Sequence, residues 1–196
     1  MRSRGFTLVE LLVVMTIGAI LVAAAVPSMS WFIATTRAGN ASNTMVAAFE
    51  LARSEAIRRN TIVSVCRTLD PNAAEAAVAC TNAAGNGYAA GDWASGWIMF
   101  EKRGTTAASV YENGVDSILR REQPVGTGTW RLLMEGNLPG PAVAYDRFGT
   151  AASSAGTFSV DYRDTSSATL TGATRCVVVA AVTGRISVNR PVAGAC

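Results

Sequence analysis

The stretch that decides the fold lies at the start of the chain, where residues 6–26 have the sequence FTLVELLVVMTIGAILVAAAV. The run is almost entirely apolar, and it is interrupted only by Thr7, Glu10, Thr16 and Gly18. As a helix, its roughly 21 residues extend about 32 Å, which is enough to cross the hydrocarbon core of a bilayer. The sequence therefore predicts a membrane-spanning helix at this end of the chain.

Charges beside this run predict its direction in a membrane. Arg2 and Arg4 precede the run, and the positive-inside rule keeps such a basic end in the cytoplasm and sends the remainder of the chain outward. The whole chain has 17 basic and 14 acidic side chains, a net charge of +3. That charge is too small to indicate nucleic-acid binding by itself.

Composition excludes several classes of enzyme. The 196 residues are 49% apolar, which fits one domain with a sizeable core. The chain contains no histidine, so it cannot build a Ser-His-Asp triad, a Cys-His dyad or a histidine-ligated zinc site. The four cysteines lack CxxC spacing, which argues against a metal cluster or a redox motif. We therefore expect a protein that is not an enzyme and that needs no cofactor.

Glu10 separates three interpretations of the apolar run. A secretory signal peptide would explain the basic start and the small residues Ala23 to Ala25, and a plain membrane anchor would explain the length. Neither has a use for Glu10, whose carboxylate costs up to about 3 kcal/mol in a membrane helix. A carboxylate in such a place requires a partner, which favours a helix that uses Glu10 for pairing.

The segment Gly5–Glu10, GFTLVE, follows the short basic leader and resembles the type III signal of type IV pilins and type II secretion pseudopilins. The resemblance implies that a prepilin peptidase cuts after Gly5 and methylates the new N-terminus at Phe6. It also implies filament assembly by helix packing, in which the Glu10 carboxylate meets the Phe6 amine of a neighbouring subunit. Pro27 falls where the family commonly carries a proline, and we expect it to kink the helix.

Beyond Pro27, a helical pattern resumes and then gives way to strands. Apolar residues recur at helical spacing at Met45, Phe49, Ala52 and Ala56, and Glu55 can pair with Arg58 or Arg59 on the wetter side. From Thr61 the period changes toward two, which predicts strands at 61–67, 96–102, 117–121, 130–134, 143–145, 157–162, 175–182 and 185–188. We expect a tight hairpin turn at 182–185 and a long surface loop at 69–95.

Three blocks of this second part resemble the GspH/FimT branch of the pilin superfamily, which includes the minor pilins FimU and FimT and the minor pseudopilin GspH. They are LARSEAIRRN at 51–60, DWASGWIMF at 92–100 and TGRI at 183–186. The resemblance implies an α+β fold, in which a long N-terminal helix packs on a small antiparallel β domain of two sheets. The expected organisation is a leader at 1–5, a transmembrane and assembly helix at 6–27, its amphipathic continuation at 28–60 and a β-rich domain at 61–196.

The function implied is that of a minor pilin, which primes or tips a type IV pilus after cleavage and N-methylation. Two alternatives stay open: a minor pseudopilin of type II secretion, and a pilus-associated subunit that binds DNA in natural transformation. The implied partners are other pilins or pseudopilins, prepilin peptidase and the inner-membrane assembly platform. The implied location is a single pass through the bacterial inner membrane with a periplasmic domain, and afterwards the filament.

Four cysteines in a domain outside the cytoplasm favour two disulfides, with three possible connectivities. We expect the pairing of sequence neighbours, Cys66 with Cys80 and Cys176 with Cys196. The first bridge would close about 15 residues and contribute roughly 3 kcal/mol. The second would tie the final residue back to a strand.

Two arginines near the C-terminus bear on DNA binding. Some FimT proteins bind DNA through a Gly-Arg-x-Arg motif, and residues 184–187 here are Gly-Arg-Ile-Ser, so only the first arginine is present. Arg190 is the candidate to replace the second arginine. Two or three arginines neutralise few phosphates, so we expect weak, salt-sensitive DNA binding at most. The favoured interpretation of Arg185 is a turn or edge-strand residue facing solvent.

Overall fold

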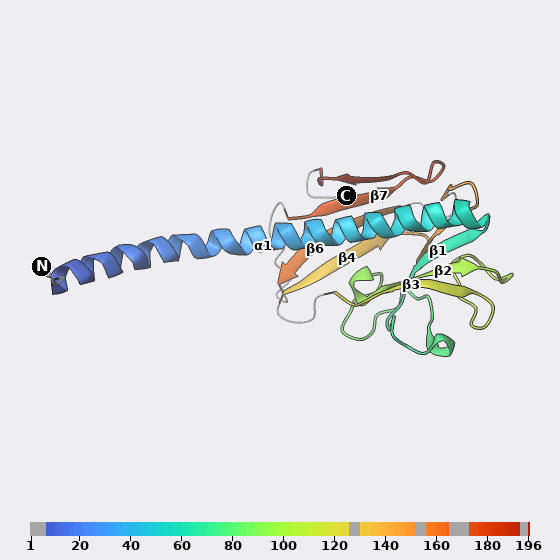
Figure 1. Cartoon of the computed structure of the whole chain (residues 1–196), viewed down its shortest axis with the longest axis horizontal. Helices are drawn as coiled ribbons and strands as arrows, with labels where there is room; N and C mark the ends of the chain where they lie inside the picture. Colours follow the sequence, from blue (N-terminus) through green and yellow to red (C-terminus); the bar gives the residue numbers. More distant parts are fainter. Residues whose placement is uncertain (1–6, 126–129, 152–155, 165–172, 193–195) are drawn as a thin grey trace, which may run out of the picture.

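A long helix and eight strands make up the part of the chain that the computed structural model describes, residues 7–125, 130–151, 156–164, 173–192 and 196 (Figure 1). Every expected strand is present, with shifted ends, which confirms the predicted α+β fold. The elements are α1 (Leu8–Arg59), β1 (Ile62–Arg67), β2 (Trp97–Lys102), β3 (Ser117–Glu122), β4 (Trp130–Asn137), β5 (Ala142–Tyr145), β6 (Gly156–Asp164), β7 (Arg175–Val179) and β8 (Ile186–Asn189), with short 3-10 turns at Glu75–Ala77 and Trp93–Ser95.

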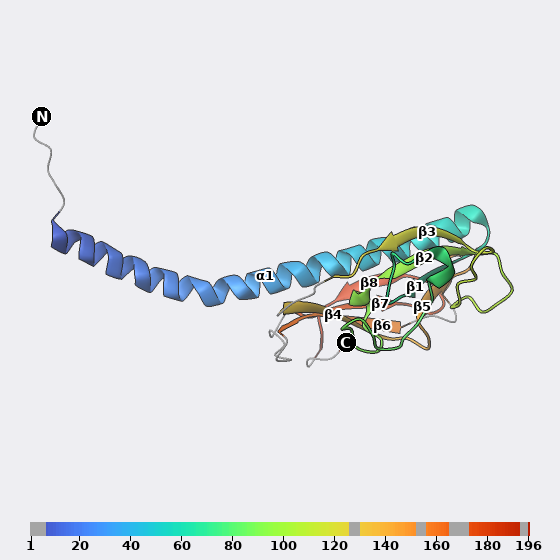
Figure 2. The ribbon, with the colours of Figure 1, turned by 90° about the horizontal axis from the view of Figure 1, so that it is seen from below.

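Helix α1 is continuous over its 52 residues, a length of about 78 Å. It ends at Asn60, which adopts a left-handed conformation and donates its N–H to the carbonyls of Ala56 and Ile57. The N-terminal half of α1 stands clear of the strands and is curved (Figure 2). Pro27 lies inside the helix and does not end it, and its assignment as the cause of a kink stays a prediction.

The C-terminal half of α1 supplies one wall of the core. Its predicted apolar stripe is confirmed, because Met45, Phe49, Ala52 and Ala56 are each at most 2% exposed. The stripe starts earlier than predicted, since Ala34 and Ala38 are also fully buried; the buried alanines on this face let the helix backbone approach the strands closely. The predicted charge pairs are present beside the stripe, where the Glu55 carboxylate contacts both Arg58 and Arg59 at 2.6 Å.

Two four-stranded antiparallel sheets form the rest of the domain. Their strand orders are β3-β2-β1-β5 and β4-β6-β7-β8. Helix α1 contacts strands of both sheets and lies across them in Figure 1. The helix therefore bridges the two sheets, and burial of its stripe stabilises their relative placement.

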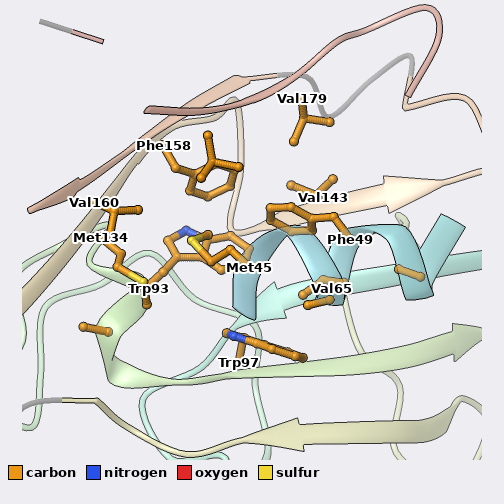
Figure 3. Packing of buried hydrophobic residues seen from close by; sticks show 14 of the residues in the cluster. Met45, Phe49, Val65, Trp93, Trp97, Met134, Val143, Phe158, Val160 and Val179 are labelled. Atoms are coloured by element: carbon orange, nitrogen blue, oxygen red, sulfur yellow. The ribbon is translucent and has the colours of Figure 1, made fainter. Parts of the chain in front are cut away.

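An aromatic cluster fills the space between helix and sheets (Figure 3). The ring of Phe49 on α1 lies 6.3 Å from the ring of Trp93 and 5.3 Å from that of Phe158 on β6. Trp93 and Phe158 meet edge to face at 5.2 Å. The predicted surface loop at 69–95 is therefore wrong at its end, because Trp93 is only 1% exposed and belongs to the core.

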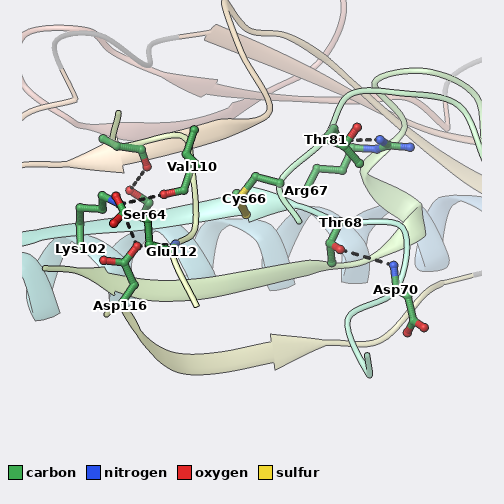
Figure 4. The surroundings of a disulfide bond; sticks show 12 residues. Ser64, Cys66, Arg67, Thr68, Asp70, Thr81, Lys102, Val110, Glu112 and Asp116 are labelled. Atoms are coloured by element: carbon green, nitrogen blue, oxygen red, sulfur yellow. Dashed lines mark hydrogen bonds and ion pairs between the residues drawn. A yellow bond between two sulfur atoms is a disulfide. The ribbon is translucent and has the colours of Figure 1, made fainter. Parts of the chain in front are cut away.

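The remainder of that loop is held by one buried arginine. Arg67 at the end of β1 is fully buried, and its guanidinium donates to four backbone carbonyls, those of Thr81, Ala83, Ala89 and Asp92. A disulfide between Cys66 and Cys80 fastens the first part of the same loop (Figure 4). A long loop without regular structure is thereby given a fixed course, because each carbonyl that leaves water gains a charged donor.

A second buried cation organises the connection between β2 and β3 (Figure 4). The Lys102 ammonium lies 2.8 Å from the Asp116 carboxylate and 3.0 Å from that of Glu112. Asp116 also accepts backbone N–H groups from Arg103, Gly104 and Glu112. Burial opposes ionisation of Asp116, but the lysine and these N–H donors prevail and lower its pKa below the usual value.

The turn between β7 and β8 is wider than the predicted tight turn at 182–185. The N–H of Gly184 donates to the carbonyl of Ala180, and the N–H of Ala180 donates to the carbonyl of Arg185. Gly184 has a φ of +61°, and a Cβ there would lie 2.2 Å from the carbonyl oxygen of Gly149. Close approach to a neighbouring turn, rather than hairpin geometry alone, therefore determines the conformation at Gly184.

We predict that Asp116 makes the stability of the domain depend on pH in acid. Because the pKa of Asp116 is lowered by folding, its contribution is present above pH 4 and is lost as pH falls below that value. Asp116→Asn should lower the free energy of unfolding at pH 7 by about 3 kcal/mol, since it leaves the buried Lys102 without a carboxylate on that side.

Urea unfolding of the full chain in detergent, followed between pH 7 and pH 2, measures both effects. Asp70→Asn is the matched control, because Asp70 is exposed in a turn and should change the free energy of unfolding little. An Asp116→Asn variant that is as stable as the wild type at pH 7 would contradict the assignment.

Candidate functional site

The N-terminal motif is described from its third residue onward, since Gly5 and Phe6 lie outside the described residues. Thr7 caps the first turn of α1, and its hydroxyl oxygen accepts the backbone N–H of Glu10 at 3.2 Å. Glu10 lies in the first turn, where the helix dipole favours a carboxylate. Sequence reasoning missed this cap, although the Thr-x-x-Glu spacing of Thr7 and Glu10 is a known signal for a helix start.

The arm of α1, which we define as residues 8–23, presents apolar side chains to solvent. They occupy consecutive positions and therefore point to every side of the helix. Within the described residues, no helix combines the length and apolar character of a membrane-crossing segment. The large apolar residues of the arm, 47–79% exposed, are Leu8, Val9, Leu11, Leu12, Val13, Val14, Met15, Ile17, Ile20, Leu21 and Val22.

An exposed apolar surface of this size is typical of an interaction site, because folded domains rarely leave so much apolar surface in contact with water. The buried stripe of α1 begins at Ala34, so the globular domain covers no part of the arm. Burying the arm against lipid or against other helices would remove roughly 1.5–3 kcal/mol of unfavourable exposure per large side chain. Glu10 is the ionisable residue of this surface.

All four cysteines are paired in the structure. Cys66 is joined to Cys80 and Cys176 to Cys196, which is the pairing of sequence neighbours. Both bridges belong to the globular domain, because Cys66 lies in β1 and Cys176 in β7. Among the described residues, no group of three or more His, Cys, Asp or Glu side chains could hold a metal ion.

The two candidate DNA-contact arginines are not brought together. Arg185 precedes β8 in the turn, whereas Arg190 follows β8, so the length of the strand, about 16 Å, separates them. Both side chains are exposed. The structure instead places Arg185 beside the turn that contains Arg147 and Phe148, because Gly184 contacts Gly149. No sequence signal indicated this juxtaposition, since the two turns are far apart along the chain.

Comparison with known proteins agrees with this architecture. A family described as "Type II transport protein GspH" matches residues 41–183, and the "Prokaryotic N-terminal methylation motif" matches residues 1–26. No curated protein matches the chain. The first match spans residues 41–59 of α1 and seven complete strands, and the second spans the leader and the apolar run.

Two solved structures are similar to this chain, both of the type IV minor pilin FimU from Pseudomonas aeruginosa strain PAO1. The structure in space group P21 is 16% identical, with a TM-score of 0.50, and the match covers 80% of this chain and 93% of FimU. The structure in space group P65 is also 16% identical, with a TM-score of 0.45 and coverage of 78% and 96%. Because the GspH match extends over well more than half of the sequence, the chain belongs to the GspH family and is a minor pilin or pseudopilin.

Proposed function

We propose that the chain is a minor pilin that primes or tips a type IV pilus and enters the filament through its arm. The observation that carries this proposal is the arm itself, a continuous helix whose apolar side chains are exposed on every side while the same helix is anchored in a folded domain. The apolar side chains of such a helix must be buried against lipid or against other helices. Lipid covers it before assembly, and the arms of neighbouring subunits cover it afterwards.

Membrane insertion before assembly follows from the same chemistry. Counted over residues 6–26 of the full sequence, which extend beyond the described residues, the apolar run is long enough to reach across a bilayer, and the two leader arginines favour a cytoplasmic N-terminus with the globular domain in the periplasm. Both disulfides lie in that domain, which fits an oxidising compartment. Prepilin peptidase would cut between Gly5 and Phe6 and methylate Phe6, and the inner-membrane assembly platform would extract the mature subunit.

Glu10 gives the assembly its register. In a bundle of apolar arms, an unpaired carboxylate or amine costs several kcal/mol. Cleavage at Gly5 creates a positive amine on Phe6, and this amine can pair with Glu10 of a neighbouring subunit. Only one axial displacement of two parallel arms brings the two groups together, so the pair selects position as well as contributing attraction.

A minor pseudopilin of type II secretion is the second candidate. The description of the matching family as a type II transport protein favours it. Both roles use the same arm, the same cleavage and the same pairing. Deletion of the gene distinguishes them, because loss of surface filaments indicates the pilus and loss of secreted enzymes indicates the secretion system.

The first prediction concerns the mature N-terminus. Protein purified from membranes should begin at N-methylated Phe6, as measured by mass spectrometry of the N-terminal peptide. Gly5→Trp should block cleavage, whereas Ser3→Trp, a matched change inside the leader, should leave it intact. A mature chain that begins after Ala25 would show instead that the run is an ordinary signal peptide.

The second prediction separates insertion from assembly. Glu10→Val should leave the amount of subunit in the membrane unchanged or higher, because the apolar run becomes more apolar. Its incorporation into filaments should fall by about tenfold or more, because the Phe6 amine loses its partner.

Quantitative immunoblots of membranes and of sheared, purified filaments give the two values. Glu50→Val is the control, since Glu50 is an exposed glutamate on the same helix but in the globular domain. Normal incorporation of the Glu10→Val variant would refute the pairing role.

A further inference from the structure

Three large apolar side chains are exposed where the last turns of α1 meet two surface turns. Ile57 on α1 is 51% exposed, Phe148 in the turn after β5 is 71% exposed and Val182 in the turn before β8 is 78% exposed. Figure 1 shows this end of the domain opposite the arm. Exposed apolar residues that gather at one place on a folded domain are typical of a contact surface.

Three arginines accompany these side chains. Arg147 places its guanidinium 5.0 Å from the centre of the Phe148 ring, Arg185 ends the turn that carries Val182, and Arg53 lies one helical turn before Ile57. None of the three forms an ion pair within the described part of the chain, unlike Arg58 and Arg59. The Arg53 Nε is buried and has no hydrogen-bond partner there.

Close contacts at two glycines hold together the end of α1 and the two surface turns. A Cβ on Gly149, which has a φ of +75°, would lie 2.9 Å from the Ile57 side chain and 3.0 Å from Arg53 Nε. Gly184 packs in turn against the Gly149 carbonyl. We call the surface formed by Arg53, Ile57, Arg147, Phe148, Val182 and Arg185 the distal patch.

Asp146 fixes the turn that carries Phe148. Its carboxylate accepts the backbone N–H groups of Phe148 and Thr150 at 3.0 and 2.8 Å, and the Thr150 hydroxyl at 2.7 Å. Burial opposes ionisation of Asp146, but these hydrogen bonds and the nearby Arg147 charge prevail and lower its pKa, so the carboxylate stays ionised as the acceptor in the turn. The distal patch is therefore preformed, which reduces the ordering cost of binding.

The composition of the distal patch matches a protein partner better than a nucleic acid. Aromatic and arginine side chains are enriched where protein interfaces concentrate their binding energy. Three phosphate contacts would bind DNA only weakly at physiological salt. The exposed apolar side chains of Val182 and Ile57 would make no favourable contact with a charged phosphate backbone. A protein surface with an apolar recess bordered by carboxylates would instead cover the apolar side chains and pair the arginines.

We propose that the distal patch docks the globular domain of a neighbouring filament subunit, one that presents carboxylates around an apolar recess. This inference rests on the proposed function, because only subunits held in parallel by their arms bring such a domain to this end of the chain. The contact would then fix which subunit follows this one along the filament, while the arms supply the common packing.

Photo-cross-linking in assembled filaments tests the inference. We replace Phe148 by p-benzoylphenylalanine in the full chain, irradiate sheared and purified filaments, and map adducts by mass spectrometry. The same replacement at Val192 is the positional control, because Val192 is 82% exposed and lies beyond the far end of β8. We expect adducts from position 148 on the globular domain of a second filament subunit, near apolar residues flanked by Asp or Glu, and few from position 192.

Charge reversal provides the matched chemical test. Arg185→Glu and Arg190→Glu change the net charge equally, at opposite ends of the same strand. We expect Arg185→Glu to reduce the cross-link from position 148 by about tenfold, the size of effect expected at a close charged contact, and Arg190→Glu to leave it unchanged. A 30-base-pair duplex at about 150 mM salt is the competing probe.

The possible results of these experiments distinguish failure of the docking inference from failure of the proposed function. If the wild-type chain is present in filaments but position 148 yields no more adducts than position 192, the docking inference is wrong and the proposed function stands. If duplex DNA binds the wild type and Arg185→Glu alone abolishes that binding, the patch is a nucleic-acid site and the inference is also wrong. If the wild-type chain is absent from both filaments and pseudopili, the proposed function fails and the inference fails with it.

Discussion

Phe49 on α1 lies against Trp93 and Phe158, and this aromatic contact connects the helix to both halves of the β domain. Trp93 begins the 3-10 turn that leads through Gly96 into β2 of one sheet, and Phe158 belongs to β6 in the other. Without a helix between them, the two sheets would leave their inner faces exposed to water. The contact also fixes the direction in which α1 leaves the domain, and therefore the direction of the arm.

One helix thus serves two purposes. Its second half is part of the core, so the first half can present apolar side chains without a need to fold onto its own domain. The position of the arm determines which end of the domain faces along a filament. The distal patch lies at the opposite end of the same helix, where α1, the turn at 146–150 and the turn at 180–185 converge.

Local signals in the sequence were sufficient for the helix, the strands and the core stripe. Met45 and Phe49 repeat at helical spacing, and each strand is bounded by turn residues. Contacts that depend on distant segments were not predictable in this way. The four carbonyls on Arg67, the burial of Trp93 and the approach of Gly184 to Gly149 all require the sheets to be assembled first.

For the candidate site, the motif could be recognised from the sequence, but the residues that lie around it in the fold could not. The positions of Gly5, Phe6 and Glu10 follow from the N-terminal pattern, whereas the cap by Thr7 was overlooked despite its recognisable spacing. Arg185 was predicted as a turn or edge-strand residue facing solvent, and it is exposed in the turn before β8. Its neighbours Arg147 and Phe148 could not be predicted, because no local pattern links the two turns.

Burial of the arm by neighbouring subunits is the central requirement of a filament role, and cysteine labelling measures it directly. Ile20→Cys places a thiol on the exposed arm, and Asn43→Cys places one on the exposed side of α1 within the globular domain. Each is treated with a maleimide in intact filaments and again after the filaments are dissolved in SDS. Assembly through the arm predicts that Ile20→Cys is protected in filaments and labelled only after dissolution, while Asn43→Cys is labelled in both. Equal labelling of Ile20→Cys before and after dissolution would contradict assembly through the arm.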